Sequence, residues 1–406
     1  MIKKVKTEDL KVGMYVHDLK MPWLEHTFAT NHFKLQNEKQ IEKILSMHIS
    51  DVLIDTAKGY DAAHAPTQKE AETELMDMIL DIASEPGNEP PHSKLDLQWA
   101  ESKQIRSEAV KVVADVLTDA RIGKQVNVER AAPIVSDITN AVLGNDGTLV
   151  SLCRIKKRDS YTFQHSVSIS ALLVTFCHAI GGFEESEMHE IGLGGLFHDV
   201  GKMRIPNQIL NKPGRLTDAE FAIMRSHVDE GVKYLQEGHA LSKSAMSIVS
   251  EHHERFDGSG YPRGKSHRSI SKLGQMASIV DVYDAITSIR VYHKALEPIN
   301  AMQLIFEWGG KHFDESLVQQ FIKGVGIYPV GSLVRLESAR LAIVLRQGEN
   351  NLLKPLVRLV FDTRLGYQLP PQDLDLAAPD CQDNIVGYEI PTSWGIDPFH
   401  FIGKGR

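Results

Sequence analysis

Seven imidazole and carboxylate side chains recur through the middle of the chain, in segments that must meet if they act together. They are His165, His198, Asp199, His227, His252, His253 and Asp281. An octahedral ion that keeps open positions takes about three or four protein ligands, so this set is too large for one ion. Two ions about 3.5–4 Å apart, sharing one carboxylate, would use the whole set, and such pairs hydrolyse phosphoesters. The sequence therefore predicts a two-metal centre and a fold that gathers distant segments around it.

Two of these groups are adjacent pairs, His198-Asp199 and His252-His253. Neighbouring residues within a helix point in different directions, but at a helix end both can reach one ion or straddle two. Gly201 and Pro206 favour a helix end beside the first pair. A histidine on its own is more often packed or solvated than a metal ligand. We assign that ordinary role to His178, His189, His239 and His267.

Composition limits the partners that the chain can have. Its 406 residues, 42% hydrophobic and 24% charged, suit two or three soluble domains. A formal charge of −8 argues against a general affinity for a nucleic acid polymer or an anionic membrane. Cys153, Cys177 and Cys381 form no CxxC pair and the first residues contain no signal-peptide core, so we expect a cytoplasmic protein. The uncharged stretch from Ser166 to Phe183 predicts a buried helix and not a membrane span.

Periodicity divides the chain into five parts. Residues 1–65 predict a small α+β domain, 66–96 an acidic helix near 68–84 and a linker, and 97–147 connecting helices. Residues 148–325 predict the helical domain with the metal centre, and residues 326–406 predict a β-rich extension. The expected fold is therefore mainly α: an all-helical bundle with a small α+β domain at the N-terminus and a β appendage at the C-terminus.

Several elements within these parts are defined more sharply. The patterns predict a helix from Asn37 to His48 and a strand from Ser50 to Thr56. Thr217 and Glu220 form a capping box, at the start of a helix that we expect to continue to His227. The runs SLVRLES, RLAIVLRQ and KPLVRLVFD predict three strands in the extension.

Three motifs in the helical part carry a resemblance to a known family. They are HDVGK at 198–202, HHERFDGSGYPRG at 252–264 and DVYDAITSIRVY at 281–292. Together with His165 and His227 they closely resemble the HD-GYP family, a branch of the HD phosphohydrolase superfamily linked to hydrolysis of bacterial cyclic dinucleotides. The β-rich tail is similar to the usual extension of this family, and the first 130 or so residues resemble an N-terminal domain of unassigned function.

The resemblance implies a division of the ligands between two metals, with Asp199 bridging them. The first site would be completed by His165, His198 and Asp281, and the second by His227, His252 and His253. Divalent Fe or Mn suits this ligand set best, and Ni, Co or Zn would also bind it. Members of the three-metal type carry a glutamate four positions before the first histidine. Tyr161 stands there in this chain, which predicts two metals.

The resemblance also implies residues on the substrate side. Lys202 would lie near the scissile phosphate and, with Asp199, act in catalysis. The loop residues expected to bind substrate are Gly260, Tyr261 and Pro262, with Arg290 and Lys294 as basic contacts. Many members read Arg-Pro-Tyr-Lys where this chain reads Arg-Val-Tyr-His at 290–293. The usual basic contact would therefore pass to His293 or to Lys294.

The predicted function is hydrolysis of a 3′,5′-cyclic dinucleotide to the linear dinucleotide by a metal-bridging hydroxide. Cyclic di-GMP is the default substrate, and 3′,3′-cyclic GMP-AMP is an alternative. A catalytically silent cyclic di-GMP receptor that signals through its N-terminal domain is a second alternative, and an HD-type di-iron oxygenase is a third. The N-terminal domain would serve regulation or docking of a signalling partner, and a homodimer fits the sequence although no heptad run specifies one.

Overall fold

The computed structural model describes residues 1–20, 28, 31–84, 95–125, 127–144, 147–154, 156, 161–212, 214–238, 241–288, 296–348 and 351–402. The chain divides into two compact units. One comprises residues 1–78 and 206–224, and the other comprises residues 79–205 and 225–406.

The first unit contains the small α+β domain expected at the N-terminus. Its antiparallel sheet has the order β1-β4-β2-β3. The strands are β1 (Ile2–Lys6), β2 (Tyr15–Asp18), β3 (Phe33–Lys34) and β4 (Asp51–Asp55). Helix α1 (Glu38–Leu45) is capped by the Asn37 side chain, which accepts a hydrogen bond from the backbone of Gln40. Ile41 and Ile44 of this helix join the strand residues in one hydrophobic core.

Three further helices begin in this unit. The predicted acidic helix is present as α2 (Gln68–Ser84), and α8 (Asn207–Leu210) and α9 (Asp218–Arg225) follow much later in the chain. The predicted capping box at the start of α9 is confirmed: Glu220 accepts from the Thr217 backbone at 2.7 Å, and Thr217 Oγ accepts from the Glu220 backbone at 3.3 Å. The expectation that this helix continues to His227 is wrong, because a turn at Ser226 ends it and His227 begins a new helix.

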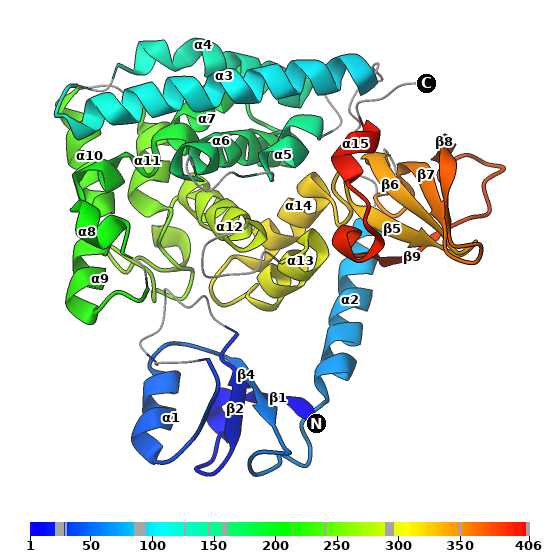
Figure 1. Cartoon of the computed structure of the whole chain (residues 1–406). Coiled ribbons are helices and arrows are strands. Elements are labelled where there is room, and N and C mark those ends of the chain that lie inside the picture. The colour runs from blue at the N-terminus through cyan, green and yellow to red at the C-terminus, as the bar shows by residue number, and fades with distance from the viewer. Residues whose placement is uncertain are drawn as a thin grey trace. The chain divides into compact units, whose positions relative to one another are not determined.

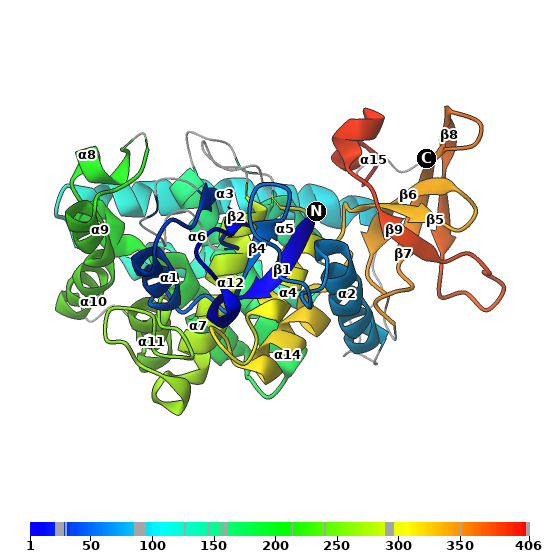
Figure 2. The same ribbon diagram turned by 90° about the horizontal axis from the view of Figure 1, so that it is seen from below.

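The second unit holds the helical bundle (Figures 1 and 2). Its helices are α3 (Leu95–Arg121), α4 (Ala132–Leu143), α5 (Thr148–Cys153), α6 (Tyr161–Ile180), α7 (Glu185–Phe197), α10 (His227–Glu237), α11 (Lys243–Glu251), α12 (Lys272–Thr287), α13 (Pro298–Glu307) and α14 (Glu315–Val325). Helix α6 is central and packs against α7, α12 and α14, while α11 packs against α7 and α12. This arrangement brings helices from separate parts of the sequence around one point.

The uncharged stretch after Ser166 is buried in this bundle. Helix α6 is long and apolar enough to cross a membrane by length and composition alone, yet 72% of the relevant window is buried inside the protein. Val167, Leu173 and Phe176 are among its residues that have no or almost no exposed surface. We therefore interpret α6 as the core helix of the bundle, as the sequence predicts.

The β appendage is larger than the sequence patterns indicate. Its antiparallel sheet has the order β8-β7-β6-β5-β9. The three predicted strands are β5 (Leu333–Leu336), β6 (Arg340–Arg346) and β7 (Leu356–Asp362), and the structure adds β8 (Tyr367–Asp375) and β9 (Ile385–Tyr388). Both additions are edge strands with little buried surface, so the hydrophobic alternation that marks a strand is weak in them. Pro370 and Pro371 are tolerated in β8 because an edge strand needs fewer backbone donors.

Candidate metal centre

The seven predicted ligands lie together in the bundle, each on a helix or directly after one. His165 lies on α6 and Asp281 on α12, while His198 directly follows α7. His227 begins α10, and His252 directly follows α11. Six of the seven are buried, with exposed fractions between 1% and 9%, and the side chain of His253 is 16% exposed. Both adjacent pairs stand at helix ends, as Gly201 and Pro206 predict for the first pair.

Asp199 is the residue around which the others gather. Its Oδ2 lies 3.2 Å from His198 Nε2 and 3.7 Å from His165 Nε2. Its Oδ1 lies 3.2 Å from His227 Nε2 and 3.8 Å from His252 Nε2. The two oxygens of one carboxylate thus face two different groups of histidines.

Two groups of side chains have the geometry to hold a metal. Asp199, His227, His252 and His253 form one group, and His165, His198 and Asp199 form the other, with ligand atoms within 4.8 Å of one another in each. Asp281 borders both groups, because Oδ1 lies 3.1 Å from His165 Nε2 and Oδ2 lies 3.7 Å from His253 Nδ1. The sequence assigned Asp281 to the first group alone, whereas its two oxygens reach both.

The chemistry of this cluster fits divalent cations. His198 Nε2 and Asp199 Oδ1 are buried without a hydrogen-bond partner, and such groups call for another ligand. Burial, aided by the nearby His198, lowers the pKa of His252 to about 3, so this imidazole is neutral and can donate a lone pair. Burial alone would raise the pKa of Asp199, but the Lys202 ammonium holds that pKa well below its usual value. Neutral imidazole and ionised carboxylate are the forms that bind metals.

Backbone contacts orient two of the imidazoles. His198 Nδ1 lies 2.7 Å from the carbonyl oxygen of Gly195, and His252 Nδ1 lies 3.0 Å from that of Val249. Because a carbonyl oxygen only accepts, both Nδ1 atoms carry the proton and donate it. In the neutral form of each ring the lone pair is then on Nε2, which points toward Asp199.

Gly201 allows the turn after α7 to touch α10. A Cβ at this position would lie 1.9 Å from the carbonyl oxygen of His227 and 2.5 Å from the backbone nitrogen of Gly231. Both are backbone atoms that cannot move away alone. A side chain at Gly201 would therefore force this turn away from the start of α10.

The loop expected on the substrate side is anchored beside the cluster. The ring of Tyr261 stacks on His253 with centroids 4.5 Å apart, and its backbone donates to the carbonyl of His253 at 3.1 Å. The buried Glu254 accepts from the backbone nitrogens of Arg263 at 2.8 Å and Lys265 at 2.9 Å. A Cβ on Gly260 would meet Arg255 N at 2.4 Å. The loop thus approaches its anchor too closely for a side chain at Gly260.

The structure describes some of the remaining predicted residues and not others. Lys202 Nζ lies 2.5 Å from Asp199 Oδ2, and its side chain is 25% exposed. Pro262 follows Tyr261 through a cis peptide bond. Tyr161 packs its ring against His165 with centroids 5.9 Å apart. Arg290, His293 and Lys294 lie outside the described residues.

Three residues near the cluster were missed by sequence reasoning. Asp284 Oδ2 lies 2.6 Å from His165 Nδ1, Lys156 contacts the same carboxylate, and Glu254 anchors the loop. For two of them, the sequence contains a feature that could have identified them. Asp284 is three residues after Asp281 on a helix, so both share a face, and Glu254 directly follows the histidine pair. Lys156 lies outside the motifs, and no feature of the sequence identifies it.

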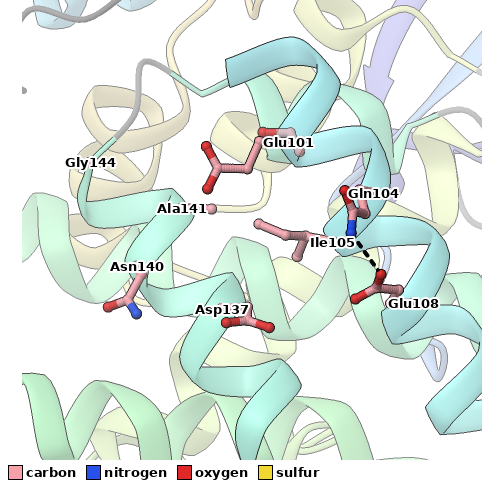
Figure 3. A pocket seen from close by; sticks show the side chains of 9 residues that line it. Glu101, Gln104, Ile105, Glu108, Asp137, Asn140, Ala141 and Gly144 are labelled. Carbon is pink, nitrogen blue, oxygen red and sulfur yellow. Dashed lines mark hydrogen bonds between the residues drawn. The ribbon is translucent and has the colours of Figure 1, made fainter. Parts of the chain in front are cut away.

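A separate pocket of about 410 Å³ lies between α3 and α4 (Figure 3). Glu101, Glu108 and Asp137 are among the residues that line it, and Gln104 donates to Glu108 at 2.9 Å. None of the predicted site residues lines this pocket. The metal centre and the pocket are therefore different places in the helical unit.

Comparison with known proteins agrees with the helical fold and with the histidine and aspartate cluster. Residues 153–317 match the HD domain family, and residues 2–131 match a domain of unknown function, DUF3391. Cyclic di-GMP phosphodiesterase PA4108 of Pseudomonas aeruginosa is 36% identical over 395 residues, which cover 97% of this chain and 94% of that protein. 3′3′-cGAMP-specific phosphodiesterase 2 of Vibrio cholerae is 34% identical over 170 residues, 42% of this chain and 32% of that protein.

A solved structure is also similar: Bd1817, an HD-GYP-type protein from Bdellovibrio bacteriovorus, covers 79% of this chain and 98% of its own at 15% identity, with a TM-score of 0.47. The HD domain implies binding of divalent metal, in agreement with the histidine and aspartate cluster. Because the Pseudomonas relative aligns over almost its whole length at well above 30% identity, the chain belongs to the HD-GYP family of hydrolases, with a DUF3391 domain at its N-terminus.

Proposed function

We propose that the chain hydrolyses a 3′,5′-cyclic dinucleotide to the linear dinucleotide, with cyclic di-GMP as the default substrate. The observation that carries this proposal is the position of Asp199, whose two oxygens face separate groups of buried histidines. The names of the Pseudomonas and Vibrio relatives support a cyclic dinucleotide and leave both cyclic di-GMP and 3′3′-cGAMP as candidates.

Each part of the cluster has a proposed task. Asp199 would be shared by two ions, with His165, His198 and Asp281 at one and the three remaining histidines at the other. Iron or manganese suits these ligands best. When bound, such ions polarise a phosphoryl group and lower the pKa of a water between them. Lys202, partly exposed beside Asp199, is placed to stabilise negative charge that develops on the phosphate.

The substrate side of the proposal rests on the loop that carries Tyr261. The ring of Tyr261 stacks on His253, which is one of the predicted ligands. The guanidinium of Arg225 lies 4.9 Å from the centre of the same ring. An aromatic ring beside a cation suits a flat base next to a phosphate. We propose that Gly260, Tyr261 and Pro262 bind the substrate, with Arg290 and Lys294 as further contacts.

One assay on the full-length protein tests the function. We expect the purified chain to hold two transition metal ions, measured by mass spectrometry, and to convert cyclic di-GMP to its linear form, measured by chromatography. The same assay with 3′3′-cGAMP compares the two substrates by kcat/KM. Two bound ions with turnover of neither compound would overturn the proposal. Tight binding of cyclic di-GMP without turnover would favour a receptor.

Lys202→Met tests the lysine separately from the metals. We expect kcat to fall about 10²–10³-fold, because a donor aimed at developing charge contributes that much. The content of metal should stay at the wild-type level, since the ammonium is not a ligand. A variant with wild-type kcat, or one that loses its metals, would contradict this role for Lys202.

The proposal also covers the location of the enzyme, its regulation and its oligomeric state. We propose that it acts in the cytoplasm, that the DUF3391 domain docks a signalling partner or regulates turnover, and that the chain can form a homodimer. The boundaries of the five predicted parts also stay predictions.

A further inference from the structure

The first histidine of the cluster is held from behind by a buried chain of polar contacts. His165 Nδ1 lies 2.6 Å from Asp284 Oδ2, and the ammonium of Lys156 contacts the same oxygen. Lys156 also donates to Ser288 Oγ at 2.7 Å. The side chains of Lys156, Asp284 and His165 are 1%, 4% and 4% exposed. These contacts are therefore shielded from water. Hydrogen bonds of charged groups are stronger in such a buried environment than in water.

The direction of the hydrogen bond fixes the state of the imidazole. An ionised carboxylate only accepts, so His165 Nδ1 carries the proton and donates it. The lone pair of His165 is then on Nε2, which lies 3.1 Å from Asp281 Oδ1 and 3.7 Å from Asp199 Oδ2. His198 and His252 obtain the same orientation from backbone carbonyls. Among these three histidines, only His165 depends on an ionised side chain for it.

The position of Asp284 is set by more than its own helix. Lys156 lies between α5 and α6, and Asp284 and Ser288 lie at the end of α12, so the ammonium links this connection to the end of α12. The ring of Tyr161 lies 5.5 Å from Lys156 Nζ and packs against His165. This packing restricts both the ammonium and the imidazole.

We propose that Asp284 and Lys156 are positioning residues: Asp284 holds His165 as a metal ligand with Nε2 facing the cluster, and Lys156 holds Asp284 in place. The proposal rests on the proposed metal centre but not on the identity of the substrate. It assigns a task to two residues that lie outside the predicted ligand set. Partners of this kind typically change metal affinity by about 10–100-fold when they are removed.

The test measures metal binding on the full-length protein, separately from turnover. In Asp284→Ala we expect the dissociation constant of one of the two ions to rise about 10–100-fold, while the other ion stays bound at wild-type affinity. Metal-buffered dialysis with manganese, followed by mass spectrometry, gives both constants. Wild-type affinity for both ions would overturn the proposal. Failure of wild type to hydrolyse a cyclic dinucleotide would instead count against the function, because this readout involves no nucleotide.

A second variant separates positioning from folding. Asp284→Ala leaves the Lys156 ammonium buried without its carboxylate, which lowers stability. The double variant Lys156→Met, Asp284→Ala removes both charges, so its melting temperature should recover toward that of wild type, while the metal defect should remain. Recovery of metal affinity together with the melting temperature would show a merely structural role and overturn the proposal.

Asp383→Ala is the matched control. Asp383 is a similarly enclosed carboxylate, 10% exposed and 3.0 Å from Arg340, but it belongs to the β appendage. We expect this variant to lose stability without any change in the binding of either ion.

Discussion

Replacement of Asp199 by alanine is expected to remove both metal ions and to lower kcat/KM by a factor on the order of 10⁴. The metals would supply several kcal/mol of transition-state stabilisation, and about 1.4 kcal/mol corresponds to each tenfold change in rate. Because the two oxygens of Asp199 face the two groups of histidines, its loss weakens both sites at once. Mass spectrometry for metal and steady-state kinetics with cyclic di-GMP measure the two effects.

The outcome expected for Asp199→Ala differs from that for a histidine ligand. Replacement of His227, which lies in one group only, should leave the other ion bound. An Asp199→Ala protein that keeps one ion at wild-type affinity would therefore contradict the sharing of Asp199. Asp383→Ala serves again as the control for the loss of an enclosed carboxylate.

Replacement of Gly201 by alanine is expected to disrupt the centre without touching a ligand. The new methyl group would lie 1.9 Å from the carbonyl oxygen of His227, so the turn and α10 must separate. Overpacking of this kind lowers the free energy of unfolding by about 1–3 kcal/mol. The separation also moves Asp199 away from His227, so metal content should fall together with the melting temperature.

Gly387→Ala is the control for Gly201→Ala. No atom lies within 4 Å of a Cβ at Gly387, which is on β9, so this variant should keep wild-type stability and both metals. Wild-type melting temperature and metal content in Gly201→Ala would show that the turn can shift freely, and would contradict the constraint that we assign to this glycine.

Much of the candidate site was predictable from residue types and their neighbours. Gly201 and Pro206 predicted a helix end beside His198-Asp199, and the number of ligands led to the proposal of two ions. The grouping of Asp281 was less predictable, because its two oxygens point to different histidines. That property depends on the rotation of α12 about its axis, which periodicity does not give at this precision.

The parts that sequence reasoning missed have physical causes. The polar chain runs from Lys156 through Asp284 to His165. Asp284 and His165 are more than a hundred positions apart in the sequence, and no local pattern encodes a contact between them. Strands β8 and β9 carry few buried residues because they lie at the sheet edges. The turn at Ser226 was missed because the helical spacing continues across it, although α10 begins anew at His227.

The loop that carries Tyr261 and the metal cluster share a short stretch of backbone. His253 belongs to one group of ligands, and the next residue, Glu254, uses both of its oxygens to hold the loop. A shift of this backbone on loss of metal would move Tyr261 as well, because its ring lies on His253. In the proposed function, loss of metal would therefore weaken the binding of the cyclic dinucleotide as well as its hydrolysis.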